Sequence, residues 1–205
     1  MHAIEPHLHG AIRWLDPGRL VDRELELVAP SERWIEEVLA ACRHPLTVRQ
    51  APREAGTTRR QLMDFLRAAP GGHDPGDPAL QRAPGYAFWM RLLPEYSPPV
   101  AIAGGCSLRI SEAPEVQRYF GNVGYHVFPP ARGRRLAERA CRLLLPLARA
   151  HGLRQLWITC NPDNWASRKT CERLGARLID IVALPPQNIL YQRGEREKCR
   201  YLLEL

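Results

Sequence analysis

Residues 121–137 read GNVGYHVFPPARGRRLA and carry two signals from which the remaining elements can be worked out. Apolar residues alternate as far as Val127–Phe128, which predicts a strand, and Pro129–Pro130 ends it. A basic turn then leads into a helical repeat. The first N–H groups of a helix have no partner within the helix, and the helix dipole adds partial positive charge there. The segment therefore predicts an anion-binding helix start, for which a solvated basic helix end is the structural alternative.

Three arginines make a phosphate group the natural occupant of this helix start. Arg132, Arg134 and Arg135 add fixed positive charge, and Gly133 lets a ligand approach the backbone closely. A pyrophosphate carries the negative charge and the acceptor oxygens that such a site would bind. The segment is not a P-loop, because the Gly-Lys-Ser/Thr ending is missing, and it lacks the three glycines of a dinucleotide fingerprint.

Apolar runs on both sides of this segment predict the strands. The middle of the chain is expected to form an antiparallel meander of three strands joined by turns, at Tyr86–Leu93, Val100–Ile110 and Tyr119–Phe128. Four further strands are expected around Leu25–Leu27 and at Leu156–Thr159, Leu178–Val182 and Arg200–Leu205.

Helical periodicity and capping residues predict four helices. They run from Ser31 to before Pro45, from Thr57 to Ala69, from Arg134 to His151 and from Asn164 to Leu174. Pro146 should kink the third helix in its last turn, because proline cannot donate to the carbonyl four residues back. The proline- and glycine-rich segment Pro70–Gly85 is expected to be a mobile surface loop.

The composition excludes several classes of protein. The 205 residues are 45% apolar and carry a net charge of +7. Of the 29 Lys and Arg residues only Lys169 and Lys198 are lysine, which leaves 27 Arg, a bias that we attribute to genomic codon composition. The apolar fraction is too high for a mainly disordered chain, and no apolar run approaches the roughly 20 residues of a membrane-spanning helix. We expect a partly flexible N-terminal arm (residues 1–23) and one domain (residues 24–205).

The cysteines and N-terminal histidines do not predict a metal site. The six cysteines lack the spacing of a zinc knuckle, and the N-terminus has no signal-peptide pattern. Free thiols in a cytoplasmic protein are therefore expected. His2, His7 and His9 lack the carboxylates or cysteines that would complete a metal cluster, so a flexible terminus is the simpler interpretation.

With this element order, two motifs resemble the GNAT superfamily of acyl-CoA-dependent N-acetyltransferases. The family's cofactor motif is Gln/Arg-x-x-Gly-x-Gly/Ala; Arg132 stands at its first position and Ala137 at its last, with Arg135 in place of the central glycine. Residues 161–176, NPDNWASRKTCERLGA, resemble the second motif through Asn164, Ser167 and Gly175. The resemblance covers about residues 25–205 and is closest to the branch with ribosomal-protein N-terminal acetyltransferases and uncharacterised bacterial relatives.

The resemblance implies an α/β (α+β) acyl-CoA N-acyltransferase fold, with a mixed, mainly antiparallel sheet whose fourth and fifth strands splay apart, flanked by helices. It also implies acetyl-CoA as co-substrate and no metal. Val127 and Phe128 would bind the pantetheine arm through their backbone. The pyrophosphate would lie against Arg132, Gly133, Arg134, Arg135, Leu136 and Ala137. Asn164 and Ser167 would face the cofactor, although both also suit a purely structural helix cap.

The reaction implied is direct attack of a neutral amine on the thioester in a ternary complex. Here the chain departs from better-known relatives, because their general-acid tyrosine corresponds to Cys171 and their general-base glutamate to Gly121. The remaining candidates are Tyr125 and His126, which strand alternation places on opposite faces. A water relay that uses backbone carbonyls would need no dedicated base.

We expect N-acetyl transfer to a primary amine of a small molecule or peptide; the alternative is a non-catalytic acetyl-CoA-binding module. Nucleic-acid and membrane partners are not expected, since the aromatic residues lie within apolar strands. A peptide N-terminus, a lysine side chain, an amino acid and an aminoglycoside all remain open as acceptors. The resemblance places the acceptor site at Pro45–Thr57, Pro70–Gly85 and Leu184–Cys199, the last of which would fold over the acceptor or form a homodimer contact.

Overall fold

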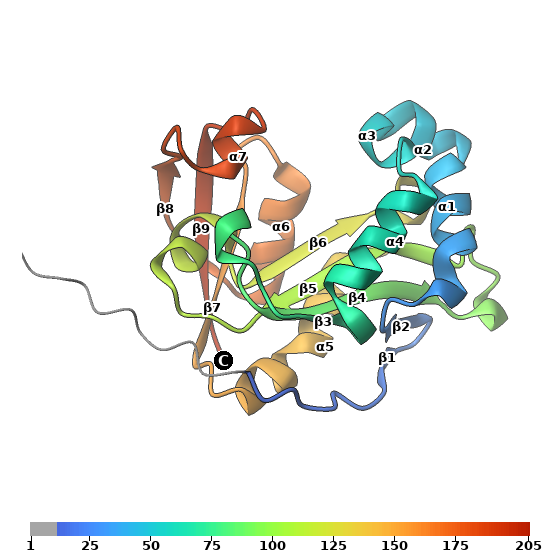
Figure 1. The fold of residues 1–205 in the computed structure, drawn as a ribbon, viewed down its shortest axis with the longest axis horizontal. Coiled ribbons are helices and arrows are strands. Elements are labelled where there is room, and N and C mark those ends of the chain that lie inside the picture. Colours follow the sequence, from blue (N-terminus) through green and yellow to red (C-terminus); the bar gives the residue numbers. More distant parts are fainter. Residues whose placement is uncertain (1–11) are drawn as a thin grey trace, which may run out of the picture.

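The computed structural model describes residues 12–205, which form two β-sheets flanked by helices (Figure 1). The larger sheet has the order β1-β2-β4-β5-β6, and β3 pairs with β4. Its strands are β1 (Leu20–Asp22), β2 (Leu25–Val28), β3 (His73–Asp74), β4 (Gly85–Leu92), β5 (Ile102–Arg109) and β6 (Val123–Val127). The smaller sheet has the order β7-β9-β8, with β7 (Gln155–Cys160), β8 (Arg177–Ala183) and β9 (Glu197–Glu204). All pairings between these strands are antiparallel.

Helices cover both faces of the larger sheet. The α-helices of the described residues are α1 (Ile35–Arg43), α2 (Pro45–Gln50), α3 (Pro52–Ala55), α4 (Arg59–Ala68), α5 (Leu136–Ala150), α6 (Trp165–Leu174) and α7 (Ile189–Gln192). Helices α1 and α4 lie over one face, and α5 lies against the other, where it contacts β1, β2, β5 and β6 (Figure 1). Helix α6 packs against α5 and β7. No helix among residues 12–205 combines the length and apolarity that crossing a membrane requires.

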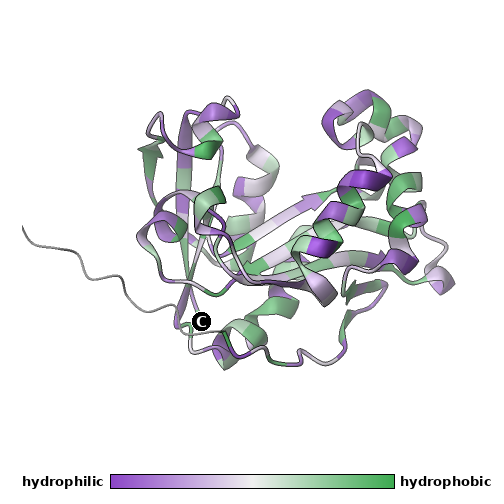
Figure 2. Ribbon diagram, viewed as in Figure 1, coloured by the Kyte–Doolittle hydropathy of each residue, from purple (hydrophilic) through white to green (hydrophobic). Residues whose placement is uncertain are grey.

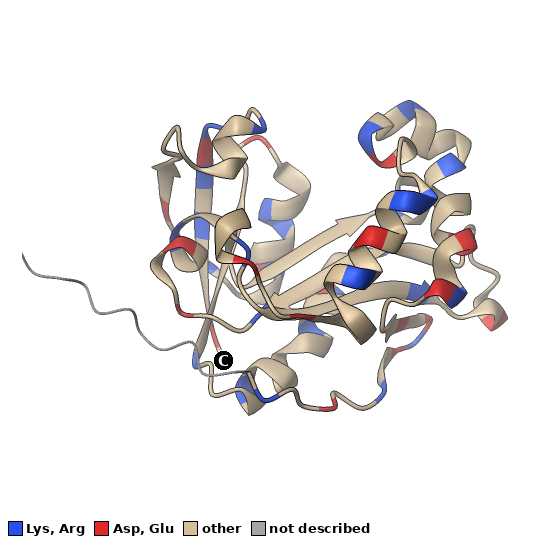
Figure 3. Ribbon diagram, viewed as in Figure 1, with Lys and Arg blue, Asp and Glu red and all other residues tan. Residues whose placement is uncertain are grey.

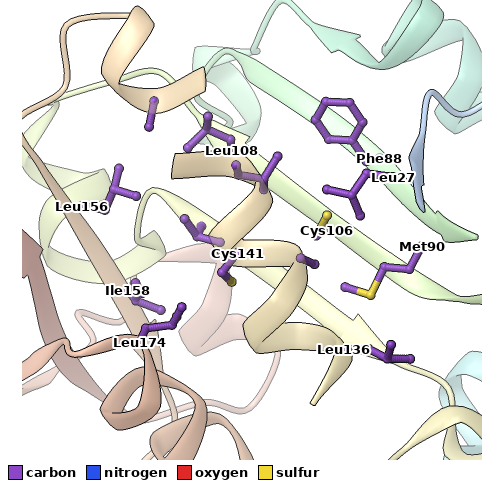
Figure 4. Close-up of a cluster of buried hydrophobic side chains, with 14 of the residues drawn as sticks. Leu27, Phe88, Met90, Cys106, Leu108, Leu136, Cys141, Leu156, Ile158 and Leu174 are labelled. Atoms are coloured by element: carbon purple, nitrogen blue, oxygen red, sulfur yellow. The ribbon is translucent and has the colours of Figure 1, made fainter. Parts of the chain in front are cut away.

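Two apolar cores hold these layers together. The larger one lies between α5 and the sheets and includes Met90, Leu108 and Leu144, each 0% exposed. Figure 4 shows side chains of this core converging from strands of both sheets and from α5 and α6. The smaller core joins α1 and α4 to the opposite face of the larger sheet through residues such as Ile35 and Ile102. Helices α1 and α5 carry both apolar and polar residues (Figure 2), and their buried residues recur three or four positions apart, as an amphipathic helix requires.

Asn122 closes one end of the junction between the two sheets. Its backbone N–H donates to the Trp157 carbonyl at 2.5 Å, and its side-chain oxygen accepts the Trp157 N–H at 2.9 Å. The Asn122 amide nitrogen also donates to the carbonyls of Arg109 (3.2 Å) and Ser111 (2.9 Å). Beyond these hydrogen bonds β6 and β7 belong to separate sheets. The fourth and fifth strands of the expected fold therefore separate, as predicted.

Several expectations need correction. Residues Tyr119 and Phe120 belong to a π-helix, Val116–Phe120, rather than to the start of a strand, because the chain must turn at Gly121 (φ 69°) to enter β6. Helix α5 runs through Pro146 without interruption. Segment 70–85 contains β3 and two short 3-10 helices, Pro70–Gly72 and Pro78–Leu80. Strand β1 lies within the stretch expected to be an arm, whereas His2, His7 and His9 lie outside the described residues.

Candidate active site

The open end of the junction lies where β6 runs into the start of α5. Phe128 donates its N–H to the Ala103 carbonyl at 2.7 Å and accepts the Ala131 N–H at 2.9 Å. Both backbone groups of Phe128 are thus used inside the chain, so the predicted backbone contact to a pantetheine arm is left to Val127. The Val127 carbonyl accepts a hydrogen bond from Arg132 Nε at 3.1 Å. The carbonyl oxygen has a second lone pair, so it can accept a further hydrogen bond from a ligand.

The start of α5 presents a run of unpaired backbone donors. Within the described part of the chain, the N–H groups of residues 133–138 have no hydrogen-bond partner. Gly133 has φ 86°, a conformation that favours glycine, and a Cβ built there would meet nothing within 4 Å. Leu136 is buried beneath the turn and Ala137 is half-buried, so both offer the site their N–H groups only. The predicted anion-binding residues therefore come together.

Arg135 stands where the family motif has glycine, and its backbone adopts the left-handed conformation that favours glycine. It is the N-cap of α5 with φ 54° and ψ 29°, in the left-handed region, and its side chain makes no cap hydrogen bond. An L-residue in this region costs about 1 kcal/mol or more. The turn is therefore preserved at a cost in backbone strain, and the guanidinium of Arg135 is exposed instead of filling the turn.

The charge at this helix start is not neutralised by the protein. Arg132, Arg134 and Arg135 are exposed, and none forms an ion pair within residues 12–205. Elsewhere Lys and Arg are spread over both sheets and most helices (Figure 3). By contrast, Arg139 one turn further on donates to Asp22 at 2.6 Å and Glu24 at 2.8 Å. Three exposed arginines without ion-pair partners in the described chain thus lie within four residues of one another at a helix start, which fits a ligand with phosphate groups.

A cavity opens beside these arginines. It has a volume of about 660 Å³ and is lined by Arg134 and Arg135 together with Tyr96, Glu24 and Glu138. Arg139 holds the pKa of Glu24 below its usual value through their hydrogen bond, although burial acts in the opposite direction. The carboxylate is therefore ionised and tied to Arg139, which leaves Arg134 and Arg135 available to an anion.

The side chain of Tyr125 extends from β6 to helix α6. Its hydroxyl lies 2.8 Å from Ser167 Oγ and 4.0 Å from Cys171 Sγ. Burial, with the thiol of Cys171 nearby, raises the pKa of Tyr125, so the phenol stays protonated. Asn164 accepts the Ser167 N–H at 3.1 Å and is the N-cap of α6, as the structural interpretation of this pair expects. Two of the three catalytic candidates, Tyr125 and Cys171, are thus brought together.

Cys171 belongs to a group of buried thiols behind Tyr125. Interaction with the Cys160 thiol at the end of β7, together with burial, raises the pKa of Cys171. The same interaction lowers the pKa of Cys160. Cys160 is the direct strand partner of Cys199. All six cysteines of the chain are free and buried.

His126 points to the other face of β6, into a second and smaller pocket of 230 Å³ under α1 and α4. Its ring packs edge-on to Phe128, with 5.4 Å between ring centroids. The imidazole lies over Gly105, where an added Cβ would meet His126 Cε1 at 2.9 Å. The surrounding protein lowers the pKa of His126 by desolvation, and the negative charge of Glu54 opposes that shift. The imidazole is therefore neutral at pH 7 and open to the pocket.

Gly121 cannot carry the base that some relatives of the family place there. A Cβ at Gly121 would lie 2.9 Å from the Thr159 nitrogen and 3.0 Å from the Trp157 carbonyl oxygen. The position is at the closed end of the junction, where β7 leaves no room for a side chain. The absence of a glutamate follows from the packing of this chain.

Of the three segments expected to form the acceptor site, only one lines the small pocket. Segment 45–57 contributes Glu54 and Thr57, whereas neither 70–85 nor 184–199 lines this pocket. Instead, Gln81 joins those two segments to each other, since its side chain accepts the Ile189 N–H at 3.3 Å and donates to the Gln187 carbonyl at 3.4 Å. Sequence reasoning missed Glu54 because α3 is a four-residue helix without a periodic pattern.

Comparison with solved structures identifies the same fold in several acetyltransferases. The microcin C7 self-immunity acetyltransferase MccE, in complex with acetyl-CoA and AMP, has a TM-score of 0.64 at 16% identity, covering 90% of this chain and 94% of that one. RimL, a ribosomal L7/L12 alpha-N-protein acetyltransferase in complex with coenzyme A, has a TM-score of 0.62 at 16% identity (91% and 98% covered). A GNAT-family acetyltransferase from Bacillus anthracis has a TM-score of 0.63 at 16% identity (91% and 98%). No curated protein matches the sequence.

The family assignment comes from the sequence itself. The family model for the acetyltransferase (GNAT) domain matches residues 24–177, which include β6, the start of α5 and all of α6. The matched region spans the strand, the turn and the two helices on which the site is built. The chain therefore belongs to the GNAT acetyltransferase family.

Proposed function

We propose that this protein is an N-acetyltransferase that transfers the acetyl group of acetyl-CoA to a primary amine by direct attack in a ternary complex. The observation that carries the proposal is the run of free N–H groups and unpaired arginines at the start of α5, at the open end of the β6–β7 junction. A pocket with a neutral imidazole lies on the other face of the same strand. One strand thus separates an anion site from a pocket that would hold an acceptor.

The residues at the helix start suit acetyl-CoA. Residues 133–138 offer N–H donors for the pyrophosphate, and Arg132, Arg134 and Arg135 offer charge. Val127 offers a carbonyl on the free edge of β6, which can accept a further hydrogen bond beside that from Arg132. When bound, acetyl-CoA supplies the acetyl group as a reactive thioester.

His126 is the group that we propose accepts the proton of the amine. A general base must be unprotonated at the working pH, and desolvation by the surrounding pocket lowers the pKa of the solvent-accessible His126 below its ordinary value of 6.5. The rate should therefore rise with pH through that lowered pKa and level off by neutral pH. His126→Gln should lower kcat by about tenfold to a thousandfold and remove this acid limb. A loss below tenfold with an unchanged pH profile would favour a water relay instead.

Tyr125 is the group that we propose protonates the departing thiolate. Its raised pKa keeps the proton on the phenol, and Ser167 holds the hydroxyl at the junction between β6 and α6. The Cys171 thiol is fully buried with its Sγ 4.0 Å from the Tyr125 hydroxyl, so it serves the packing of the tyrosine. Tyr125→Phe should therefore reduce turnover more than Cys171→Ser does.

The test is thiol release from acetyl-CoA with a panel of primary amines, with the acetylated product identified by mass spectrometry. All six protein thiols are buried, so a thiol-reactive dye should report released coenzyme A with little background. Amine-dependent release together with an acetylated amine is the expected result. Tight acetyl-CoA binding without release for any amine would instead indicate the non-catalytic binding module.

A further inference from the structure

The pocket at His126 is apolar on almost every side. Its walls come from Val38 of α1, Leu62 and Phe65 of α4, and Trp89 of β4. The rings of Phe65 and Trp89 lie with centroids 6.4 Å apart and planes inclined by 34°. Such walls would bind an apolar or aromatic group and would leave the hydroxyls of a polyhydroxylated ligand without partners.

Charge in this pocket is negative, although the chain as a whole carries +7. Glu54 lines the pocket, and no lysine or arginine does. Unlike Glu36 on the neighbouring helix, which pairs with Arg59, Glu54 forms no ion pair within residues 12–205. At His126 the charge of Glu54 opposes the larger lowering of the pKa by desolvation. At Cys42 it adds to the raising of the pKa by burial, which Arg43 opposes. The carboxylate therefore acts on groups inside the pocket. A half-buried carboxylate without a cation would attract an ammonium group.

The pocket is also small. Its 230 Å³ is below the roughly 300–1,000 Å³ of sites that hold drug-sized ligands. One aromatic or branched aliphatic group fills such a space, so the rest of any larger acceptor must lie outside the pocket. The remaining polar groups are the Cys42 thiol, whose pKa is raised by burial, and the Thr57 hydroxyl.

Resting on the function proposed above, we infer that the acceptor is a primary amine attached to a single apolar or aromatic group, which the Phe65–Trp89 wall holds while Glu54 attracts the ammonium toward His126. The amine is either a free aryl- or alkylamine or the amino terminus of a peptide whose first residue is apolar. Aminoglycosides and amines with polar side chains are excluded by the same walls.

The test compares matched pairs of acceptors by kcat/KM. For free amines the pair is 2-phenylethylamine and ethanolamine, and for peptides it is the amides of Phe-Ala-Ala and Ser-Ala-Ala, with kanamycin added. We expect the apolar member of at least one pair to be preferred by about tenfold or more, because the polar member forgoes the apolar contacts. The pair with the larger preference identifies the source of the amine. Equal or better use of the polar member in both pairs, or use of kanamycin equal to that of the preferred amine, would overturn the inference.

Two variants and a control locate the effect in the pocket. Phe65→Ala should reduce the apolar preference about tenfold, and Glu54→Gln should raise KM for the preferred amine about tenfold without changing acetyl-CoA binding. Glu32→Gln removes the same charge at an exposed position outside the pocket and should change neither. If Glu54→Gln behaves like the control, the assigned role of Glu54 is wrong.

Binding measurements separate this inference from the proposed function. If no amine is acetylated although acetyl-CoA binds, catalysis fails, and calorimetry with the two free amines still tests the pocket. Tighter binding of 2-phenylethylamine than of ethanolamine, weakened by Phe65→Ala, would support the inference. Equal binding of the two amines would overturn it.

Discussion

Arg135→Gly should make the protein more stable while leaving acetyl-CoA binding largely in place. Arg135 has φ 54°, where an L-residue is disfavoured by about 1–2 kcal/mol, and its side chain makes no cap hydrogen bond that would be lost. Glycine removes that strain but costs about 0.4–1 kcal/mol through the added freedom of the unfolded chain. The net gain is about 0–1.6 kcal/mol, centred on about 0.8 kcal/mol, and this central value corresponds to a rise in Tm of about 2–3 °C for a chain of this length.

The same substitution removes one of three unpaired cations from the predicted phosphate site. Because Arg135 is exposed, its attraction to a phosphate is screened, and we expect the Kd for acetyl-CoA to rise by less than tenfold. Arg135→Ala keeps the strained backbone and loses the same charge. It should therefore match the glycine variant in Kd but fall below it by about 0.5–1 kcal/mol in stability.

The assays are urea unfolding for stability and calorimetry for acetyl-CoA affinity. Ser97→Gly provides a matched control, because Ser97 is exposed, has φ 46° and does not itself line the cavity, although its neighbour Tyr96 does. It should shift stability in the same direction and leave Kd unchanged. Equal stability of the glycine and alanine variants at 135 would refute the strain argument. Loss of all binding in both would show that the guanidinium, rather than the backbone, holds the phosphates.

Three further substitutions test other parts of the site. Gly105→Ala places a Cβ 2.9 Å from His126 Cε1, so it should displace the imidazole and lower kcat at least tenfold, with circular dichroism and thermal unfolding close to wild type; full activity would contradict the assigned position of the ring. Tyr125→Phe removes the hydroxyl that lies 2.8 Å from the buried Ser167 Oγ, and it should lower the free energy of unfolding in urea by about 1 kcal/mol. An unchanged free energy of unfolding would show that this contact does not stabilise the fold. Arg139→Gln breaks the two ion pairs that join α5 to the β1–β2 hairpin and should cost about 1–2 kcal/mol at pH 7. Because the ion pair lowers the pKa of Glu24, its contribution is lost as the pH falls through that lowered pKa, so the loss should be smaller in acid; a loss that does not depend on pH would rule out an electrostatic role.

The elements with local signals were predicted well. Asn164 and Gly175 bound the helix that they were expected to cap, and strand alternation placed Tyr125 and His126 on opposite faces. These features depend on neighbours within a few residues along the chain. Side-chain periodicity and cap chemistry are therefore enough to locate them.

Features that depend on distant contacts could not be predicted. The run that includes Tyr119 is as apolar as a strand, yet it forms a π-helix, because Gly121 must turn the chain beside β7. The double use of the Phe128 backbone depends on Ala103, 25 residues earlier. Glu54 becomes part of a pocket only when α3 is folded next to β6. Such juxtapositions come from tertiary packing and leave no pattern in the local sequence.

Hydrogen–deuterium exchange with and without acetyl-CoA tests most directly whether the start of α5 binds the cofactor. The amides of residues 133–138 have no partner in the protein and should exchange rapidly in the free state. If they bind the pyrophosphate, saturating acetyl-CoA should slow exchange in peptides that cover this turn and the edge of β6, while exchange in β8 stays unchanged. Acetyl-CoA binding that leaves residues 133–138 exchanging as fast as before would contradict the account.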